Sequence, residues 1–579
     1  MRDKSPTLLQ RQIIECSGKV VLKSCPGSGK TFVVATKMIN EVFNWKYKNK
    51  GIALLSFTNV ANNEINRQIK DNFGIYKINY PHYTGTIDSF ISQFLFLPYG
   101  HLIMGCSERP SIIQDYSLNI KRYSDKIWRA ECYQNGCDSL DFYIDIDGDV
   151  KNIRKDVSNC TINKRKPCIA LKSYCYKHGY ATYTDVITIA IRILESYPDI
   201  GKLLARKFPT IIIDEAQDTS AYQMRIIELL DIYGVSNILI IGDPDQAIYE
   251  WRNADPSVFL NKYYNTEWNP RELNENFRCS QNICNATKVF STLSCVSVAS
   301  GRSATSDFKP QVLKYNADDK TEVIEYFLDI CQQRHIEVTP DQVAVLVRGR
   351  SGLSGKDYSQ INNLWQSQTA KLLSEAAYER DYKSIGRAAN LVSKALFQVF
   401  INSSLISNDI DFDAIEKIMT RKLWMKIVFK FCRSMPCADI PLGLWKNKIM
   451  ILISQFKAEY NLKILLGSEI KIKTRDTKLK DFLEQPLKNF YAKSIADNYL
   501  NSTIHAVKGC TFEAVLLLIG KNGKLTSNML NTKPIESEEI RTAYVAMTRA
   551  TQVLIVAIPS TIKKNSLLRF STTDWDLKL

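Results

Sequence analysis

The sequence predicts an α/β protein built on two parallel sheets, each flanked by helices. Seven short runs rich in Val, Ile and Leu end in polar residues or glycine, and stretches with helical periodicity separate them. Runs of this kind are typical of strands that are buried on both faces of a parallel sheet. They fall into two groups, one ending at residue 243 and one beginning at residue 342. We therefore expect two α/β domains.

The predicted strands follow one another in these two groups. The first group comprises KVVLKS (19–24), GIALLSF (51–57), TIIIDE (210–215) and NILIIGD (237–243), and the second comprises QVAVLVRG (342–349), AVLLLIG (514–520) and QVLIVAI (552–558). Two long segments interrupt the pattern. Residues 93–180 are rich in Tyr, Asn, Lys and Cys and contain the hairpin signal Asp147-Gly148, whereas residues 353–497 have mostly helical periodicity. Both are expected to be insertions into the α/β frame.

The composition favours a partner that carries negative charge. The 579 residues include 76 Lys and Arg against 60 Asp and Glu, for a formal net charge of +16. This balance fits a polyanion such as nucleic acid, although a basic protein without such a partner has the same balance. No apolar run reaches the ~18–20 residues that a membrane span needs, and the first residues lack a secretory signal. We therefore expect a cytoplasmic protein with no membrane partner.

The sequence favours neither a zinc site nor a calcium site. The 15 cysteines include no C-x-x-C pair, which is typical of free thiols in a reducing compartment. Asp145, Asp147 and Asp149 briefly resemble a calcium loop. Val150 stands where that loop needs glycine, so calcium is excluded.

A phosphate-binding loop is predicted between the first strand and the helical stretch that follows it. SCPGSGKT (24–31) fits the pattern G-x-x-x-x-G-K-[ST] except at its first position. Gly27 and Gly29 allow the backbone to turn tightly around phosphate oxygens, Lys30 would reach the β- and γ-phosphates, and Thr31 would hold Mg²⁺. The predicted nucleotide-binding residues of this loop are Ser24, which replaces the first glycine, Cys25, Pro26, Gly27, Ser28, Gly29, Lys30, Thr31 and Phe32.

Two adjacent carboxylates follow the third predicted strand, in IIIDEAQD (211–218). Asp214 would bind Mg²⁺, directly or through water, and Glu215 would orient or deprotonate the attacking water. Alternatively, the two acids simply cap a strand end. Beside a phosphate loop, the pair predicts hydrolysis of a nucleoside triphosphate.

The residues that follow carry a family resemblance. IIIDEAQDTSAYQ and then LIIGDPDQAIYEWRNADP (239–256) resemble the UvrD/Rep/PcrA family of superfamily 1 DNA helicases, in which the second run has the form GD-x-x-Q-x-IY-x-WRGA. The matching residues are Gly242, Asp243, Gln246, Ile248, Tyr249, Trp251, Arg252 and Ala254, and Asn253 replaces the glycine. The resemblance implies two RecA-like domains, with ATP and Mg²⁺ bound between them.

Further stretches resemble the nucleotide-binding motifs of that family. QRQIIE (10–15) implies that Gln10 reads adenine, and LNENFRCSQNI (273–283) implies that Phe277 stacks on adenine while Arg278 contacts the γ-phosphate. EEIRTAYVAMTRA (538–550) implies that Arg549 is the arginine finger. The catalytic set implied by the resemblance is Lys30, Asp214, Glu215, Gln246, Arg278 and Arg549.

Three more stretches resemble the motifs that hold single-stranded DNA. They are LSFTNVANNEI (55–65), GTIDSF (85–90) and STIHAVKGCTFEAVLLL (502–518), and Asp88 and Thr511 depart from the usual residues of the family. The implied DNA contacts are Phe57, Thr58, Asn59, Thr86, Asp88, Tyr249, Trp251, Arg252, His505 and Lys508. Base stacking on aromatic rings would tolerate any sequence. Ordinary core packing is the alternative for Tyr249 and Trp251.

The resemblance also implies the domain bounds. The first RecA-like domain is expected at 1–92 plus 181–275 with an insertion at 93–180, and the second at 276–352 plus 498–579 with a reduced helical insertion at 353–497. The implied activity is ATP-driven 3′–5′ translocation on single-stranded DNA or on DNA with a 3′ tail, with unwinding of duplex.

Two other functions remain open at this stage. The compact chain resembles the short helicase subunits of Gabija-type anti-phage systems, which implies an OLD-family nuclease partner and an ATPase that senses DNA and controls that nuclease. The leading hypothesis is a DNA-stimulated ATPase and helicase that acts in repair or replication, the defence subunit is the second hypothesis, and an RNA helicase is the third.

Overall fold

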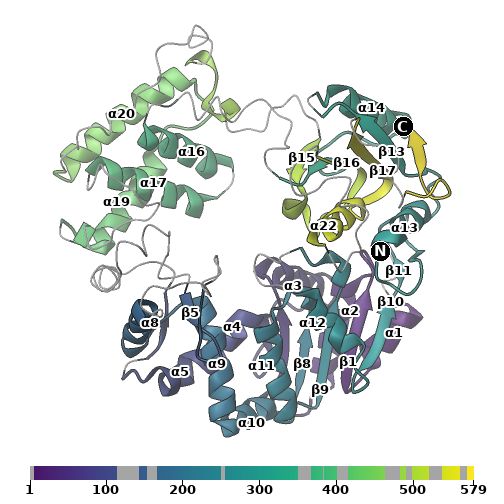
Figure 1. Cartoon of the computed structure of the whole chain (residues 1–579). Coiled ribbons are helices and arrows are strands. Elements are labelled where there is room, and N and C mark those ends of the chain that lie inside the picture. The colour runs from purple at the N-terminus through teal and green to yellow at the C-terminus, as the bar shows by residue number, and fades with distance from the viewer. Residues whose placement is uncertain are drawn as a thin grey trace. The chain divides into compact units, whose positions relative to one another are not determined.

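A computed structural model describes most of the chain. The described residues are 5–107, 109–113, 142–152, 166–248, 255–317, 319–349, 365, 367–382, 384–400, 415–416, 418–462, 483–490, 499–520, 537–560 and 570–578. They form two compact units, one comprising Met1–Leu353 with Tyr499–Leu579 and the other comprising Ser354–Asn498. The first unit contains two six-stranded sheets and three small two-stranded ones, and the second is helical (Figure 1).

The first sheet has six strands, and every neighbouring pair in it is parallel. Their order across the sheet is β10 (Asn269–Leu273), β1 (Lys19–Ser24), β9 (Asn237–Gly242), β8 (Thr210–Ile213), β2 (Ile52–Ser56) and β3 (Tyr83–Thr86). The four strands predicted in the first group are confirmed. The two edge strands, β3 and β10, were not predicted, because YTGT and NPREL lack an apolar run.

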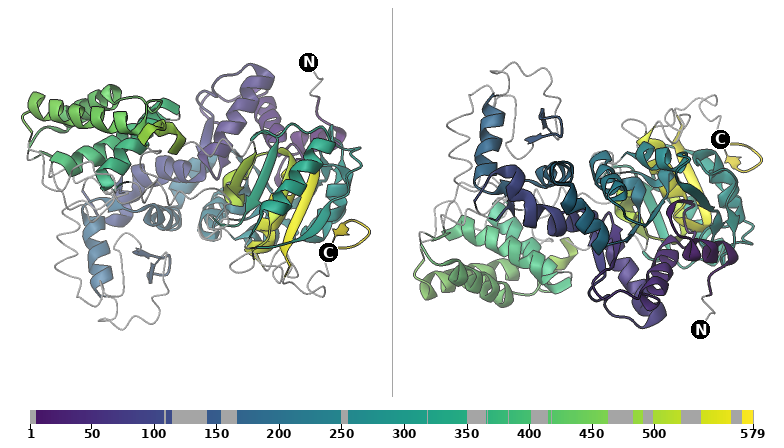
Figure 2. Two further views of the ribbon diagram at one scale, coloured as in Figure 1. Left: turned by 90° about the horizontal axis from the view of Figure 1, so that it is seen from above. Right: turned by 90° about the horizontal axis from the view of Figure 1, so that it is seen from below.

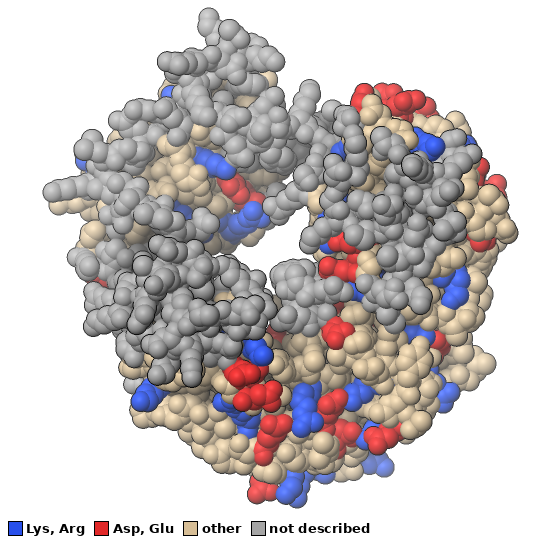
Figure 3. Space-filling view, viewed as in Figure 1, with Lys and Arg blue, Asp and Glu red and all other residues tan. Residues whose placement is uncertain are grey.

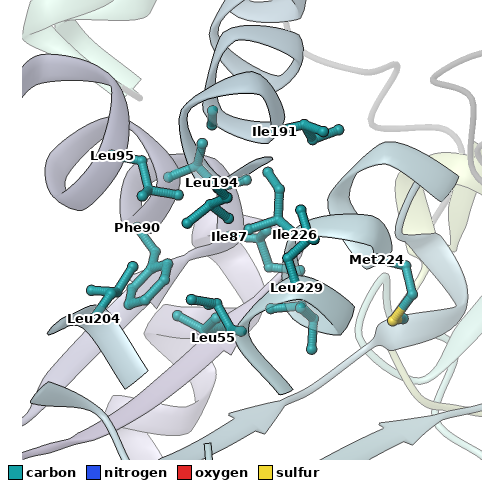
Figure 4. Close-up of a cluster of buried hydrophobic side chains, with 14 of the residues drawn as sticks. Leu55, Ile87, Phe90, Leu95, Ile191, Leu194, Leu204, Met224, Ile226 and Leu229 are labelled. Carbon is teal, nitrogen blue, oxygen red and sulfur yellow. The ribbon is translucent and has the colours of Figure 1, made fainter. Parts of the chain in front are cut away.

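Helices cover both faces of this sheet. Residues that alternate along a strand point to opposite faces, so Leu54 lies in one core and Leu55 in the other. One core is closed by α1 (Leu8–Glu15), α2 (Lys30–Phe43) and α3 (Asn59–Phe73), and the other by α4 (Ile87–Ile91), α9 (Tyr183–Ser196), α10 (Pro198–Lys207), α11 (Ala221–Ile232) and α12 (Pro256–Tyr263). Figure 4 shows the second core, where Leu55 lies among side chains of α4, α9 and α11.

The second sheet also has six strands with only parallel pairs. Their order is β15 (Leu500–Thr503), β14 (Val343–Val347), β16 (Phe512–Leu518), β17 (Ala550–Pro559), β13 (Gln311–Tyr315) and β18 (Asp576–Lys578). The three strands predicted in the second group are confirmed at β14, β16 and β17. Figure 2 shows the C-terminal strand at the rim of this sheet. Helices α13 (Gln281–Thr287) and α22 (Glu538–Met547) cover one face, and α14 (Thr321–Gln333) covers the other.

Short elements occur between the longer helices and strands of this unit. They are the 3-10 turns Ala216–Asp218, Pro244–Gln246, Lys288–Phe290 and Ile504–Val507, and the strand pair β11 (Glu275–Asn276) and β12 (Val298–Ala299). With two parallel sheets flanked by helices in the first unit, the predicted fold class is confirmed.

The segment 93–180 adds further elements to the first sheet's side of the unit. They are a π-helical turn (Ser92–Phe96), α5 (Leu97–Met104), β4 (Ser111–Ile112), β5 (Phe142–Ile144), β6 (Val150–Asn152), α8 (Lys166–Lys177) and β7 (Tyr180–Ala181). Strands β5 and β6 pair antiparallel, and Gly148 between them has φ 88°, so the predicted hairpin is confirmed. Over the described residues, no group of three or more His, Cys, Asp or Glu side chains is arranged to hold a metal ion by itself.

The second unit is described through α16 (Gln368–Tyr382), α17 (Ile385–Phe400), α19 (Arg421–Ser434), α20 (Leu442–Glu459) and the 3-10 turn Leu487–Phe490. These helices share one core that includes the fully buried Trp424 and Trp445. In the described parts of the whole chain, no helix is both long enough and apolar enough to span a membrane.

Candidate nucleotide and DNA sites

The loop between β1 and α2 has the backbone geometry of a phosphate cradle. Gly27 and Gly29 adopt left-handed φ values of 72° and 79°, which glycine tolerates without steric cost. Gly29 is the N-cap of α2, and no side chain caps this helix. The first N–H groups of a helix lack partners inside it and favour an anion. The loop is therefore built to receive phosphate oxygens.

Ser24 explains how the loop departs from the expected glycine pattern. It is the last residue of β1, in extended backbone, and it is fully buried. Its Oγ donates a hydrogen bond to the carbonyl of Gly242 in the neighbouring strand β9, at 3.1 Å. A residue in a strand needs no left-handed φ, so serine is accommodated here and gains a partner.

The cradle packs directly against the start of the second sheet's domain. The N–H of Phe277 donates to the carbonyl of Gly27 at 2.9 Å. A Cβ added at Gly27 would lie 2.6 Å from the Cβ of Arg278 and 3.0 Å from Oδ1 of Asn276. Position 27 therefore requires glycine for two reasons: its left-handed φ, and the close approach of Asn276 and Arg278.

A cluster of acids faces Lys30. Its Nζ lies 3.8 Å from Oε2 of Glu215, which has a left-handed φ of 53° directly after β8. Burial and the neighbouring Glu215 raise the pKa of Asp214 to about 7. Burial also acts to raise the pKa of Glu215, but Lys30 and Lys508 outweigh it and lower this pKa to about 2. Burial raises the pKa of Asp243 to about 7.

These residues fit a bound Mg²⁺. Asp214 and Asp243 are 2 % exposed, and their raised pKa values report carboxylates that a further positive charge would stabilise. Together with the hydroxyl of Thr31 they provide the oxygen ligands that Mg²⁺ prefers. The sequence predicted Thr31 and Asp214 for this role, whereas Asp243 was noted only as part of a family run.

Two arginines reach this site from the second sheet's domain, the buried Arg549 and the half-buried Arg278. Nη2 of Arg549 donates to Oε1 of Gln246 at 3.0 Å, and Nε2 of Gln246 donates to Oδ2 of Asp243 at 2.5 Å. Burial and the nearby Arg278 lower the pKa of Arg549 to about 9. Burial lowers the pKa of Arg278 as well, and its Nη1 donates to the carbonyl of Thr548 at 3.2 Å.

Burial is the largest cause of the lowered pKa values of Arg278 and Arg549. Among the described side chains, neither guanidinium of Arg278 or Arg549 forms an ion pair with a carboxylate. An anion bound between Lys30 and these two arginines would neutralise part of their positive charge. A γ-phosphate has the right charge, so the arrangement fits a nucleoside triphosphate.

The two residues predicted to hold adenine lie beside the cradle. Nε2 of Gln10 donates to the carbonyl of Ser28 at 3.2 Å, and its Oε1 accepts from the N–H of Thr7 in a capping box. Phe277 is 37 % exposed, next to the carbonyl of Gly27. Their roles toward adenine remain predictions.

A groove at the carboxyl end of β2 and β3 gathers predicted DNA contacts. It has a volume of about 680 Å³, and Phe57, Thr58, Asn59, Thr86 and Asp88 line it together with Ser89, Ser92, Gln93, Leu97, Ile112 and Tyr183. Thr58 and Thr86 are there because each caps the helix that follows its strand. Asp88 accepts a hydrogen bond from Nε2 of Gln223 at 2.7 Å.

Two other predicted DNA contacts, His505 and Lys508, are not among the residues that line this groove. Lys508 forms an ion pair with Asp218 at 2.7 Å, and Nε2 of His505 lies 3.2 Å from the carbonyl of Ile248. Both contacts join the second sheet's domain to the first. Tyr249, Trp251 and Arg252 lie outside the described residues. The DNA roles of all five stay predictions.

Comparison with known families supports the same architecture. The UvrD/REP helicase N-terminal domain matches residues 7–267, and the UvrD-like helicase C-terminal domain matches residues 444–561. Together these matches span more than half of the chain. The chain belongs to the UvrD-like helicases. The family resemblance seen in the motifs is thus confirmed, while its Gabija subtype stays a prediction.

Individual relatives within the UvrD-like helicases cover different shares of the chain. ATP-dependent DNA helicase Rep of Buchnera aphidicola is 24 % identical over an alignment of 644 positions, gaps included, which covers 94 % of this chain and 92 % of Rep. The exonuclease/helicase subunit RexA of Lactococcus lactis is 33 % identical over an alignment of 205 positions, gaps included, which covers 29 % of this chain. The chain spans only 17 % of the length of RexA.

Sequence reasoning missed several residues of this helicase site. Asn276 accepts hydrogen bonds from the N–H groups of Arg278 and Cys279, both at 2.9 Å, and so fixes the turn that carries Arg278. Asp218 and Tyr183 were equally unassigned. Tyr183 directly follows the Thr182 cap of α9, so its place in the groove was visible only once that helix start was known.

Proposed function

We propose that this UvrD-like helicase hydrolyses ATP in response to single-stranded DNA and uses the energy to move along the strand from 3′ to 5′. The observation that carries the proposal is the contact between Arg549 and Gln246. Arg549 comes from the domain of the second sheet, whereas Gln246 follows a strand of the first. Because both domains contribute residues to the site, a bound nucleotide changes how strongly the two domains favour contact over separation.

The residues of the first domain supply binding and water activation. The cradle and Lys30 would bind the phosphates, and Glu215, kept ionised by Lys30 and Lys508, would orient and deprotonate the attacking water. Mg²⁺ held by Thr31, Asp214 and Asp243 would neutralise charge on the phosphates.

The residues of the second domain supply charge that depends on closure. Arg278 and Arg549 stabilise negative charge on the γ-phosphate only while the two domains are in contact. ATP therefore favours contact, and loss of the γ-phosphate removes that preference. The Gln246 amide contacts both Asp243 and Arg549, so it responds to the nucleotide and to the position of the second domain.

The groove that includes Phe57 supports the choice of single-stranded DNA. It combines an aromatic ring with the hydroxyl groups of Thr58 and Thr86 at the carboxyl edge of the first sheet. A ring stacks on any base, and hydroxyl groups and helix N–H groups bind phosphate without sequence preference. Strand movement would pass bases across this groove.

Turnover of ATP with and without single-stranded DNA tests the proposal. We expect stimulation by DNA in the wild type, and a loss of at least ~100-fold in both conditions for Lys30→Ala, because the phosphates lose their main cation. DNA binding should remain measurable in that variant. Lys202→Ala, which removes an exposed lysine on α10, is the control and should keep wild-type turnover. Unaltered turnover in Lys30→Ala would refute the cradle assignment.

Control of a nuclease partner is a second candidate. Several relatives are named as components of an ATP-dependent helicase/nuclease, among them one from Lactococcus lactis that is 46 % identical over 101 residues. Those residues are 17 % of this chain and 8 % of that relative. Co-purification of a nuclease that changes the DNA response of turnover would support this second function, and a turnover that is complete without any partner would argue against it.

A further inference from the structure

A surface at the amino edge of the first sheet combines exposed aromatic rings with lysines. Four rings are mostly exposed, namely Phe43 (70 %), Tyr47 (55 %), Tyr76 (80 %) and Tyr80 (72 %). Phe43 is the last residue of α2, and the three tyrosines lie in the two loops that lead into β2 and β3, at residues 44–51 and 74–82, neither of which contains an acidic residue. Single exposed aromatic residues are ordinary, but four at two adjoining loops are not.

Each of the three tyrosines has a lysine ammonium group over its ring. Nζ of Lys50 lies 4.9 Å from the centroid of Tyr47, that of Lys70 lies 5.0 Å from Tyr76, and that of Lys207 lies 5.3 Å from Tyr80. Lys46, Lys48 and Lys77 add further exposed charge to the same loops. A ring for a base, with an ammonium group beside it for a phosphate, matches the repeating unit of a single strand.

The loops that carry these residues are held in place. Gly51 donates its N–H to the carbonyl of Lys207 at 2.7 Å, and a Cβ on Gly51 would lie 1.9 Å from the carbonyl oxygen of Pro81. The backbones of the two loops therefore touch. The ring of Trp45 packs edge-on against Tyr47 and against His82, at centroid distances of 5.6 and 5.7 Å.

Alternate side chains anchor the loops and leave the tyrosines outside. Trp45, Ile75 and Ile78 pack against the core under α2 and α3, while Tyr47, Tyr76 and Tyr80 point away from it. A surface whose backbone is already fixed loses little entropy when it binds a ligand. The exposure of the rings is thus a fixed feature of the fold.

This surface is distinct from the groove that includes Phe57. The groove lies at the carboxyl ends of β2 and β3, and the loops lie at their amino ends, so the five residues of β2 separate the two by about 16 Å. Figure 1 shows α10, whose last residue is Lys207, at the end of the first sheet away from the second.

Charge alone would not single out this surface. On the face of the first unit that is visible in Figure 3, lysine and arginine side chains are interspersed with aspartate and glutamate side chains. The two loops differ from that mixed surface because they combine lysines with exposed aromatic rings and contain no acidic residue. An acidic protein segment would use the lysines but not three separate ring–lysine pairs, so the combination favours nucleic acid.

We propose that the amino-edge surface, formed by Phe43, Tyr47, Tyr76 and Tyr80 with their lysines, is a second binding site for single-stranded DNA. It would hold a part of the strand that does not occupy the groove of Phe57. The choice of DNA over other single strands rests on the proposed function, whereas the site itself rests on the rings and lysines.

Binding of labelled oligothymidylate to the full chain tests this site. In the variant Tyr47→Ala/Tyr76→Ala/Tyr80→Ala we expect affinity for a long strand to fall roughly tenfold or more, because base stacks are lost, while a short strand that fills only the groove binds as before. Tyr197→Ala/Tyr264→Ala/Tyr382→Ala is the matched control, since it removes three exposed tyrosines elsewhere. Replacement of the three surface tyrosines by Phe should restore binding.

Two further measurements identify the ligand. Photo-cross-linking of iodouracil-labelled DNA, without ATP, should map to Tyr47, Tyr76 or Tyr80, and this result does not depend on DNA-stimulated turnover. Lys48→Gln/Lys50→Gln/Lys70→Gln should lower the salt slope by about 0.7 per lost phosphate contact. Unchanged long-strand affinity with no cross-link would overturn the site. If the variants lost binding of polyglutamate but kept binding of DNA, the surface would be a site for an acidic protein, and the proposal would be overturned as well.

Discussion

Single residues in the nucleotide site show why a family pattern and a local structure can differ. Ser24 breaks the glycine pattern, yet its place at the end of β1 requires no glycine and its hydroxyl binds the carbonyl of Gly242. Gly27, in contrast, meets two separate requirements, a left-handed φ and a close approach to Arg278. The sequence motif asks for glycine at position 24 and leaves position 27 open, whereas of these two positions the contacts in the structure require glycine only at 27.

Restoring the family's glycine at position 24 should therefore weaken the protein. We expect Ser24→Gly to lower the free energy of unfolding by about 1–2 kcal/mol, because the hydrogen bond to Gly242 is lost and glycine adds freedom to the unfolded strand. Urea denaturation measures this change. Ser24→Ala separates the two causes, since it removes only the hydroxyl. A gain of stability in Ser24→Gly would contradict the explanation.

Alanine at position 27 should affect turnover as well as stability. In Gly27→Ala the added Cβ would collide with Arg278, so we expect ATP turnover to fall at least ~10-fold, together with a loss of about 1–2 kcal/mol for the left-handed backbone. Gly148→Ala is the control, because Gly148 has φ 88° and open space around its Cβ position. Equal turnover in the two variants would show that the contact with Arg278 is unimportant.

At the scale of elements, apolar runs predicted seven of the eight inner strands of the two six-stranded sheets and none of the four edge strands; the missed inner strand is β13, QVLKY. Strands such as β1, β8 and β16 are buried along nearly their whole length, so they must be apolar. Strand β10 is largely exposed and needs only backbone pairing. The candidate site follows the same logic. Residues at strand ends, such as Asp214, could be predicted from one motif, whereas Asn276 could not, because its role is to fix a neighbouring turn.

Helix α9 offers a prediction about the groove that includes Phe57. Its first residue, Tyr183, lines the groove, whereas Tyr197, which follows its last residue, does not. Tyr183→Ala should weaken binding of single-stranded DNA by about 1–3 kcal/mol if its ring stacks on a base. Tyr197→Ala, which alters the other end of α9, should leave this affinity unchanged. Fluorescence anisotropy with a short oligonucleotide measures both variants. Equal affinities would place Tyr183 outside the DNA path.

At the scale of the first unit, its two domains meet through polar contacts that converge on the nucleotide site. Arg541 donates to the carbonyl of Ala247 at 2.7 Å, and Lys508 pairs with Asp218 at 2.7 Å. Asp245 accepts hydrogen bonds from the backbone N–H and hydroxyl of Thr292. Polar contacts of this kind can be broken and re-formed in water more readily than an apolar interface, which suits domains that must separate in each cycle.

The Asp218–Lys508 pair allows this coupling to be measured. Asp218 is 3 % exposed in its side chain and Lys508 is 13 % exposed, so Lys508→Met would leave a buried carboxylate unpaired. Separation of the domains lets water reach that carboxylate. We therefore expect the variant to favour the open arrangement, with a rise of at least ~10-fold in KM for ATP and little change in the melting temperature.

A double-mutant cycle distinguishes this role from a DNA contact by Lys508. If the pair controls closure, adding Asp218→Asn to Lys508→Met restores part of the ATP affinity, even when DNA is absent, because the neutral amide no longer needs a cation. If Lys508 only binds phosphates of DNA, the second substitution restores nothing and turnover without DNA is unaffected by the first. The measurement is ATP turnover across the four proteins, with and without DNA.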